Sequence, residues 1–305
     1  MFILKILVSA VLLYFLSSKV DYAKILTILE TMNSAYLFVV LMSLVAQVFL
    51  ASLRWKKILD FFDCKYSYRK ITSFLLIGLF FNQILPSSVG GDAIRTYYIS
   101  KKCNNAWTAA RYVLLDRLFG IVALLLILII SSFFYIDLLV EFNLRIIIAL
   151  SIATSIFGVV LIIFLRKYNL GLLRYRLVRF LVKFSDEIYS ILANFKMSVT
   201  INVISLMIHF LTIVAFWGIS SSLSLDVGLE VYFFIVPIVI FVMLVPISIA
   251  GWGVREGALV YLLGFFSVST ESALVLSIIY GITNIFISLF GGIAWLAVKN
   301  NQGKD

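Results

Sequence analysis

Long apolar runs alternate with short polar segments along the whole chain. A helix needs about 20 apolar residues to cross roughly 30 Å of hydrocarbon, and six runs come close to that length or exceed it. These runs are 2–18, 35–53, 112–136, 145–165, 199–223 and 272–298. The first run lacks a cleavage site of small residues, so we expect a membrane span and not a signal peptide. The pattern predicts an all-α, polytopic membrane protein with about six full spans.

Two further apolar regions are irregular. Residues 71–85 stop before Pro86, and at about 1.5 Å per residue this helix would cover only about 22 Å. Residues 229–246 contain Pro237, and we expect this proline to break the helix because it lacks an amide hydrogen. Neither region is therefore expected to make a complete crossing.

The basic residues indicate how the chain is oriented. Lysines and arginines are concentrated in 54–70 and 166–198, whereas 137–144 and 224–230 carry only acidic charges. Basic loops of membrane proteins stay in the cytoplasm. All the basic loops face the cytoplasm, and the acidic loops the outside, only if each irregular region enters the membrane and returns on the same side. We therefore expect two opposed re-entrant hairpins, a cell-membrane location and both termini in the cytoplasm. The hairpins would comprise residues 71–100 and 229–266.

The two hairpins share a motif. "PSSVGGDAIR" (86–95) and "PISIAGWGVR" (246–255) both fit the pattern P-x-S-x-small-G-x-x-x-R. The spans on either side of them also correspond, and by the charge argument the hairpins open in opposite directions. This predicts an inverted repeat, with its binding site at the repeat interface. Repeat one would cover about 35–136 and repeat two about 199–298, in a single transmembrane domain, 1–305.

The motif offers groups that suit a phosphate. Glycine permits a tight reversal and the close approach of a ligand, a helix N-terminus favours an anion, and arginine provides a planar fork of donors. We therefore expect each hairpin tip to hold an anionic lipid head group. The candidate substrate-binding residues are Ser88, Gly90, Gly91, Asp92, Arg95, Ser248, Gly251, Gly253, Arg255 and Glu256.

The charged residues of the motif also admit a structural role. Asp92 with Arg95, or Arg255 with Glu256, could pair and merely pin a hairpin. Ionisable groups at membrane depth are costly and usually functional, so contact with a substrate or a coupling ion is the preferred interpretation.

Other polar residues favour structural interpretations. Asp116 and Arg117 lie near the start of a predicted span and are candidates for locking it against a hairpin, or for coupling. His209 is the only histidine, and a hydrogen-bonded interior role is favoured over a proton relay. Cys64 and Cys103 form no spaced motif and are expected to be reduced thiols.

Composition excludes a soluble protein. The chain is 63% hydrophobic and only 13% charged, against about 25% charged for soluble domains. Its net charge of +10 is attributed to contact of the amphipathic segment within 166–198 with an anionic leaflet. Residues 166–192 are expected to lie on an anionic cytoplasmic leaflet, and no nucleic-acid motif is present.

Three stretches carry a resemblance to a known family. "NQILPSSVGGDAIRTYYI" (82–99), "LLDRLFGI" (114–121) and "PISIAGWGVREGALVYLL" (246–263) resemble the flippase-like family that includes the transmembrane region of lysylphosphatidylglycerol synthases. The resemblance implies a membrane protein that moves lipids between leaflets or assists enzymes that modify them. The resemblance does not extend to the soluble aminoacyl-transfer domain of those synthases, so synthesis of lysyl lipid is not implied. Asp116 stands where the family more usually has glutamate.

The leading hypothesis is a flippase or a transporter of lipid-linked intermediates that acts on a phosphate-bearing head group. Alternatives are a membrane-embedded subunit of a lipid-modifying transferase, and a secondary transporter of a soluble anion. The sequence has no nucleophile beside a histidine, no metal-ligand cluster and no nucleotide loop. We therefore expect no enzymatic step, cofactor or metal. The expected partners are a lipid substrate, the anionic leaflet and a lipid-modifying enzyme.

Overall fold

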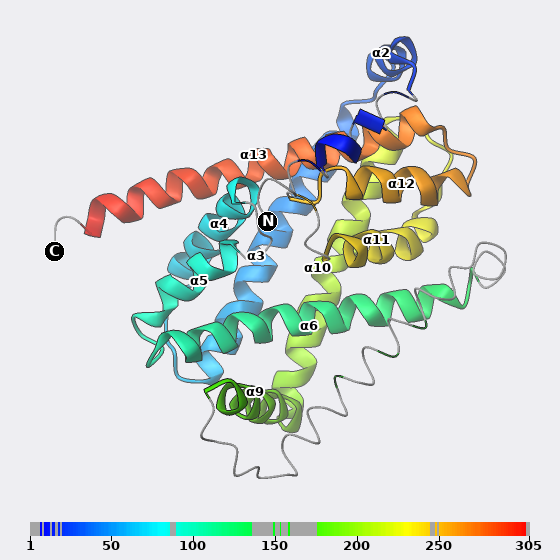
Figure 1. Cartoon of the computed structure of the whole chain (residues 1–305). Coiled ribbons are helices and arrows are strands. Elements are labelled where there is room, and N and C mark those ends of the chain that lie inside the picture. The colour runs from blue at the N-terminus through cyan, green and yellow to red at the C-terminus, as the bar shows by residue number, and fades with distance from the viewer. Residues whose placement is uncertain are drawn as a thin grey trace.

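The structure is a computed structural model of the 305-residue chain. It describes residues 7, 9–12, 14–15, 18, 20–85, 90–135, 149, 153, 158, 176–244, 248 and 250–302. In these residues the regular elements are all helices (Figure 1). They are α2 (Tyr22–Glu30), α3 (Ala35–Phe61), α4 (Tyr68–Ile84), α5 (Gly90–Ser100), α6 (Ala106–Ser132), α9 (Arg176–Ala193), α10 (Phe195–Ser222), α11 (Leu229–Leu244), α12 (Val254–Gly264) and α13 (Thr270–Gln302).

The prediction of an all-α, polytopic membrane protein is confirmed. In the part of the chain that the structure describes, α3, α6, α10 and α13 are long and apolar enough to cross a membrane. They contain the predicted spans 35–53 and 272–298 in full, and most of 112–136 and 199–223. The predicted spans 2–18 and 145–165 lie largely outside the described residues.

Two helices are longer than their apolar runs. Helix α6 begins at Ala106, where the Asn105 side chain accepts a hydrogen bond from Thr108 N at 2.9 Å and so caps the helix. Helix α3 continues eight residues beyond its apolar run, to Phe61. Arg54 therefore belongs to a membrane helix, and counting it in a basic loop was wrong.

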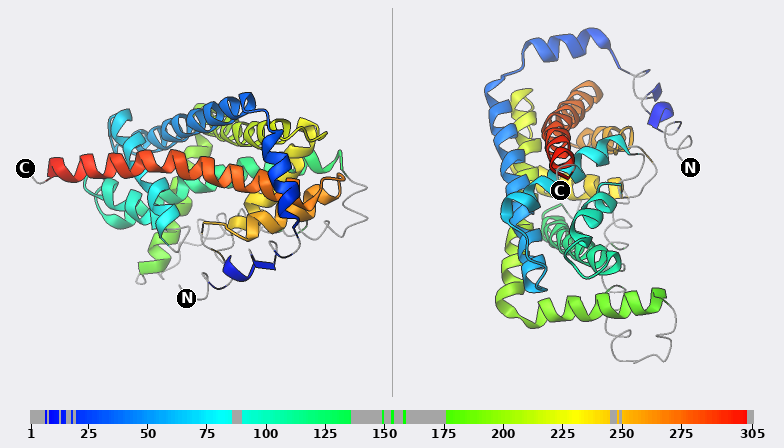
Figure 2. Two further views of the ribbon diagram at one scale, coloured as in Figure 1. Left: turned by 90° about the horizontal axis from the view of Figure 1, so that it is seen from above. Right: turned by 90° about the vertical axis from the view of Figure 1, so that its left-hand side faces the viewer.

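Helices α3 and α10 pack side by side along their length and run in opposite directions (right-hand view of Figure 2). At one end Asn33 N donates to Ser222 O at 2.8 Å. Farther along, Arg54 Nη1 donates to Ser205 Oγ at 3.0 Å. Because the residue numbers rise in one helix as they fall in the other, the pairing is antiparallel. The first helices of the two repeats are thus related as an inverted repeat requires.

The other helix contacts come in matching sets. Helix α4 packs on α5 as α11 packs on α12, and α5 packs on α6 as α12 packs on α13. The last helix of each repeat also crosses to the other repeat, since α13 packs on α4 and α6 packs on α11. This reciprocity is what a pseudo-two-fold axis produces. The depth of the two short helix pairs in the bilayer stays a prediction.

Pro237 does not break its helix, contrary to expectation. Helix α11 runs without interruption from Leu229 to Leu244 with Pro237 inside it. Proline is tolerated in membrane helices where neighbouring helices surround the freed backbone group. Pro237 is buried among such neighbours, which gives a physical reason for the difference.

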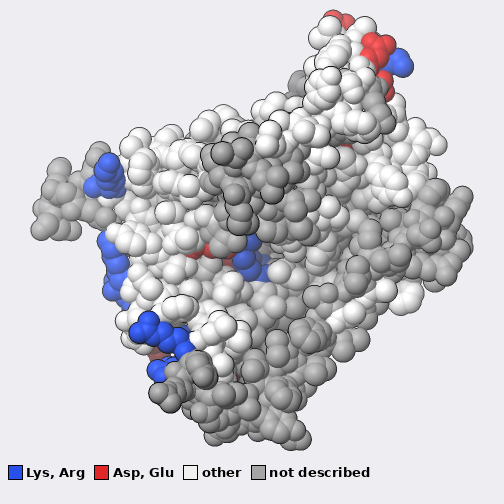
Figure 3. Space-filling view, viewed as in Figure 1, with Lys and Arg blue, Asp and Glu red and all other residues white. Residues whose placement is uncertain are grey.

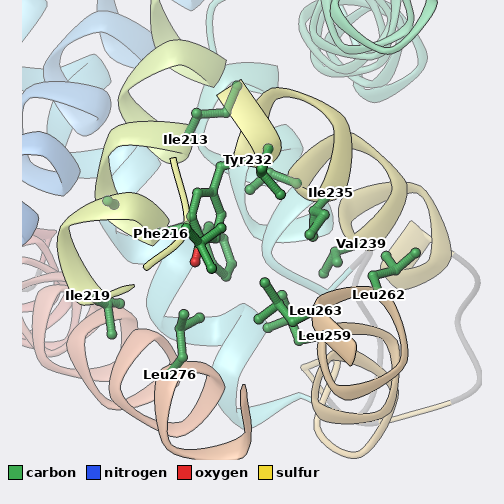
Figure 4. Packing of buried hydrophobic residues seen from close by; sticks show 14 of the residues in the cluster. Ile213, Phe216, Ile219, Tyr232, Ile235, Val239, Leu259, Leu262, Leu263 and Leu276 are labelled. Atoms are coloured by element: carbon green, nitrogen blue, oxygen red, sulfur yellow. The ribbon is translucent and has the colours of Figure 1, made fainter. Parts of the chain in front are cut away.

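The core of repeat two lies where four helices converge (Figure 4). Phe216 and Ile219 of α10 face Tyr232 of α11, Leu259 of α12 and Leu276 of α13. All five side chains are buried. In a bilayer such packing is stabilised mainly by van der Waals contact, because lipid tails are as apolar as leucine. This core holds α12, which carries the second motif arginine, against α13.

The two cysteines are not free thiols. Cys64 and Cys103 form a disulfide with a Cα–Cα distance of 5.2 Å, a separation typical of such bonds. The prediction of two reduced thiols was therefore wrong. It rested on sequence spacing, whereas the turns after α3 and after α5 bring the two residues together in a buried cluster.

Candidate functional site

Asp116 is the centre of a buried ionic cluster in repeat one. One carboxylate oxygen accepts from Arg54 Nε at 2.8 Å, and the other accepts from Arg95 Nη2 at 2.8 Å. The three residues come from α3, α5 and α6 and are all buried. Asp116 is about 15 Å from the start of α6 at 1.5 Å per residue. The carboxylate thus ties three helices together, about three turns into α6.

A second carboxylate extends this cluster towards the surface. Asp92 lies 3.5 Å from Arg95 Nη1 through one oxygen and pairs with Arg117 Nε through the other. The side chain of Arg117 is 33% exposed, whereas that of Asp92 is only 9% exposed. Figure 3 shows a small group of acidic and basic atoms near the centre of this face. We name Arg54, Asp92, Arg95, Asp116 and Arg117 the repeat-one cluster.

Arg95 is held on several sides but keeps one donor unused. Its guanidinium carbon lies 3.9 Å from the ring centroid of Trp55, a cation–π distance. Its Nε atom is buried and has no hydrogen-bond partner among the described residues. A buried donor without a partner costs free energy, so Arg95 retains capacity for a further acceptor.

The repeat-two cluster is smaller. Arg255 donates from Nε to Ser277 Oγ at 2.8 Å and from Nη2 to Glu256 Oε1 at 2.7 Å. Ser277 Oγ also donates to Glu256 Oε1 at 2.8 Å, and Gly253 N donates to Glu256 Oε2 at 2.6 Å. The guanidinium lies 4.8 Å from the Trp252 ring centroid. Here the carboxylate is the neighbour of the arginine in sequence.

The two clusters occupy equivalent places in the repeats. "LLDRLFGI" (114–121) aligns with "VLSIIYGI" (275–282), which matches Asp116 to Ser277. Each of these residues contacts the motif arginine of its own repeat, Arg95 or Arg255. The motif alignment also matches Asp92 to Trp252. Each repeat therefore has an ionic cluster at the equivalent place. Among the described residues, the cluster of repeat one contains five charged groups and that of repeat two contains two.

The glycines of the motif shape the backbone around the arginines. Gly251 and Gly253 have φ values of +81° and +85°, a region that residues with a Cβ avoid. Gly251 O accepts from Arg255 N at 2.9 Å, while Gly253 N is occupied by Glu256. In repeat one, Gly91 N donates to Asn82 Oδ1 at 2.8 Å. The amides of Gly91 and Gly253 are thus satisfied within the protein.

Three other predicted residues are not in either cluster. Gly90 begins α5 and lies against Leu85. Ser248 is described, but none of the contacts of the repeat-two cluster involves it. Ser88 lies outside the described residues. The charged candidates are thus brought together within each repeat, whereas the motif serines are not joined to them by any described contact.

Sequence reasoning missed several residues of the clusters. Arg54, Trp55 and Ser205 complete repeat one, and Ser277 completes repeat two. One signal was present for Arg54: neither glycine nor proline occurs between 53 and 61. An uninterrupted helix would therefore place Arg54 directly after the apolar run, within the same element.

Polar residues away from the clusters have structural contacts. His209 Nε2 lies 2.8 Å from Gly120 O, which ties α10 to α6. Among the residues described, no group of three or more histidine, cysteine, aspartate or glutamate side chains is placed to hold a metal ion. The arrangement offers guanidinium donors for an anion.

Gly91 lies at a close approach of α4 and α5. A Cβ there would lie 2.0 Å from Gly78 O and 2.6 Å from Asn82 Oδ1. We expect Gly91→Ala to separate the two helices and to lower the free energy of unfolding by about 1–3 kcal/mol, as overpacking does. Gly257→Ala is the control, since a Cβ at that residue would meet nothing within 4 Å. Thermal unfolding of both variants in detergent checks this, and equal midpoints would contradict it.

Comparison with known proteins is consistent with this architecture. The family model described as "Lysylphosphatidylglycerol synthase TM region" matches residues 2–292. UPF0104 membrane protein MJ1078 of Methanocaldococcus jannaschii is 26% identical over 238 residues, which cover 74% of this chain and 97% of that protein. UPF0104 membrane protein MJ1595 of the same organism is 34% identical over 79 residues, which are 26% of this chain and 24% of that protein. No solved structure matches the chain.

Proposed function

Because the chain belongs to the family of the lysylphosphatidylglycerol synthase transmembrane region, we propose that it moves a phosphate-bearing lipid head group between the leaflets. The step is transport without a covalent reaction on the lipid. Arg95 and Arg255 are the groups that bind the phosphate, in repeat one and repeat two respectively. The family relation supports a lipid-related role, and the geometry of the clusters supports the kind of step.

One observation carries the proposal. The arginine that ends each motif is buried inside the helix bundle and is held there by a carboxylate. Breaking a buried pair without replacing the lost partner costs about 3–5 kcal/mol. A phosphate can replace a carboxylate, because both accept two parallel hydrogen bonds from the guanidinium fork. The clusters are therefore suited to exchange an internal anion for the anion of a ligand.

The repeat-one cluster suggests an order of contacts. Arg117 is the most exposed of its members, so it is the first to meet a head group. The phosphate would displace Asp92 from Arg117 and then reach Arg95, whose Nε is unused. Arg54 keeps Asp116 in place through this exchange. The antiparallel repeats give the head group an equivalent arginine, Arg255, in the opposite orientation.

The same proposal includes an orientation. Figure 3 shows basic atoms along the left and lower-left edges of this face, while acidic atoms gather at the upper right over α2. The first region includes the ends of α3 and α13, and the second lies near the start of α13, where Asp21 N approaches Glu271 Oε1 at 3.5 Å. Basic ends face the cytoplasm in membrane proteins. We therefore assign the end of α3 to the cytoplasm and the start of α13 to the outside.

Single cysteines test this orientation. With Cys64 and Cys103 replaced by serine, Ser269→Cys should react with a membrane-impermeant maleimide in intact cells. Lys65→Cys, at an exposed position on the other end, should react only after the cells are opened. The reverse labelling pattern would contradict the assignment.

Reconstituted vesicles test the transport step. Purified protein would be placed in vesicles of neutral lipid with a trace of fluorescent phosphatidylglycerol, and a membrane-impermeant reductant would report the outer leaflet. We expect Arg95→Ala to slow movement about tenfold to a hundredfold, the value of one hydrogen bond to a charged group. Arg95→Lys should be intermediate, because lysine keeps the charge but loses the fork.

The controls separate transport from folding and from other solutes. Arg69→Ala removes an exposed arginine of α4 and should leave the rate unchanged. Each variant is compared only if it elutes as the wild type does by size exclusion, and Arg95→Lys serves if Arg95→Ala does not fold. Wild-type rates in a folded Arg95→Ala variant would contradict the proposal. If the vesicles took up free phosphate without any movement of lipid, the protein would instead be a transporter of a soluble anion.

A further inference from the structure

A pocket with a basic lining lies away from both arginine clusters. It is a pocket of about 450 Å³ between the start of α6 and the basic helix α9. Its described lining has four cations, Arg111, Arg176, Arg179 and Lys183, and no carboxylate. The aromatic side chains of Trp107 and Phe180 also line it. The volume is in the usual range for a ligand site, about 300–1,000 Å³.

The cation at the back of this pocket is fixed by its contacts. Arg111 Nε lies 2.9 and 3.0 Å from the two carboxylate oxygens of Glu187, and its Nη2 lies 3.2 Å from Thr108 Oγ1. Arg111 is buried. Burial raises the pKa of Glu187, while Arg111 acts to lower it. Glu187 offsets the charge of Arg111, so Arg176, Arg179 and Lys183 supply the remaining positive charge of the lining.

The rim of the pocket is aromatic and open to the surroundings. Trp107 is 57% exposed, and its ring lies 5.7 Å from that of Phe180. Leu177, on the same end of α9, is 67% exposed. Tryptophan is enriched at the level of lipid head groups. The cationic wall suits the head group of an acidic lipid, and the apolar rim suits its acyl chains.

The position of α9 also fits a membrane surface. The right-hand view of Figure 2 shows α9 lying across the lower end of α10 and not alongside it. Basic and apolar residues alternate along the helix at helical spacing. Such helices lie in the plane of the interface and are attracted to anionic leaflets. A lipid of that leaflet would reach the pocket with its head group first.

We propose that this pocket binds the phosphate group of an anionic lipid from the leaflet on which α9 lies. The lysine and arginines provide charge-assisted hydrogen bonds to the phosphate. Trp107 and Leu177 contact the upper part of the acyl chains. Binding here does not require that the protein moves lipid, so this site can be tested even if the transport proposal fails.

Calorimetry on the full chain in neutral detergent tests the site. The probes are a short-chain phosphatidylglycerol, inorganic phosphate and a short-chain diacylglycerol, which has no phosphate. The test variant is the double substitution Arg176→Gln, Lys183→Gln. The control is Lys101→Gln, Lys196→Gln, which removes the same charge at two exposed residues outside the described lining. Both double variants keep the buried Arg111–Glu187 contact.

We expect the phosphatidylglycerol probe to bind the test variant at least tenfold more weakly, because one hydrogen bond to a charged group is worth about tenfold or more. The control should bind as the wild type does. Inorganic phosphate should bind more weakly than the lipid, because it lacks contacts with the rim. Unchanged lipid binding in the test variant, or equal binding of the diacylglycerol, would overturn the proposal. Equal affinities for phosphate and lipid would overturn the lipid as the source of the phosphate.

Discussion

Asp116→Asn should destabilise the protein more than any other single substitution in repeat one. Two guanidinium groups, of Arg54 and Arg95, donate to this carboxylate from opposite oxygens. Asparagine has one acceptor oxygen and would direct its NH₂ group at the other arginine. Arg54 would then lose its carboxylate partner and Arg95 would keep only Asp92, at 3.5 Å. We expect a loss of about 3–5 kcal/mol in the free energy of unfolding. Unfolding of the purified protein in detergent, followed by circular dichroism, measures this loss.

A matched control and a double variant test the cause. Asp60→Asn removes a carboxylate of α3 that pairs with Lys56 at the surface, and such pairs contribute at most about 1 kcal/mol. Adding Arg54→Met to Asp116→Asn removes the cation that has lost its carboxylate partner, so it should recover part of the loss. If the two substitutions were simply additive, Asp116 and Arg54 would not be coupled and the cluster would not act as a unit.

Glu256→Gln should have a comparable effect in repeat two. Glu256 is fully buried and accepts hydrogen bonds from Gly253 N, Arg255 Nη2 and Ser277 Oγ. Glutamine would turn an NH₂ group towards either the backbone amide or the guanidinium, so one donor would face another. Arg255 would also lose its charged partner. We expect a loss of about 3–5 kcal/mol, the range for a broken buried pair.

The second control is another glutamate near the start of a helix. Glu271→Gln changes a partly exposed side chain at the beginning of α13 and should change the unfolding midpoint far less. A double variant, Glu256→Gln with Arg255→Met, should be more stable than Glu256→Gln alone, because no buried cation is left unpaired. A midpoint for Glu256→Gln equal to that of the wild type would mean that this pair does not anchor α12.

Membrane helices were predictable from the sequence because their signal is local. A run of apolar residues lowers its transfer free energy residue by residue, whatever its neighbours are. The four long helices were found for this reason. The shared motif was also local, and it located Arg95 and Arg255 before any contact was known. The C-terminal end of α3 and the start of α6 were missed. Polar residues beyond an apolar run can extend a helix when capping and packing allow it.

Sequence alone therefore determined the class of the protein, and it drew attention to the two motif arginines, whose role stays a prediction. Only the tertiary structure decided what surrounds those arginines. Arg54 and Asp116 are 62 positions apart, and Arg54 and Ser205 are 151 apart, so no local pattern links them. The disulfide and the continuity of α11 through Pro237 were settled in the same way. Pairing energies depend on distances between helices, and those distances are set by how α3, α6 and α10 pack.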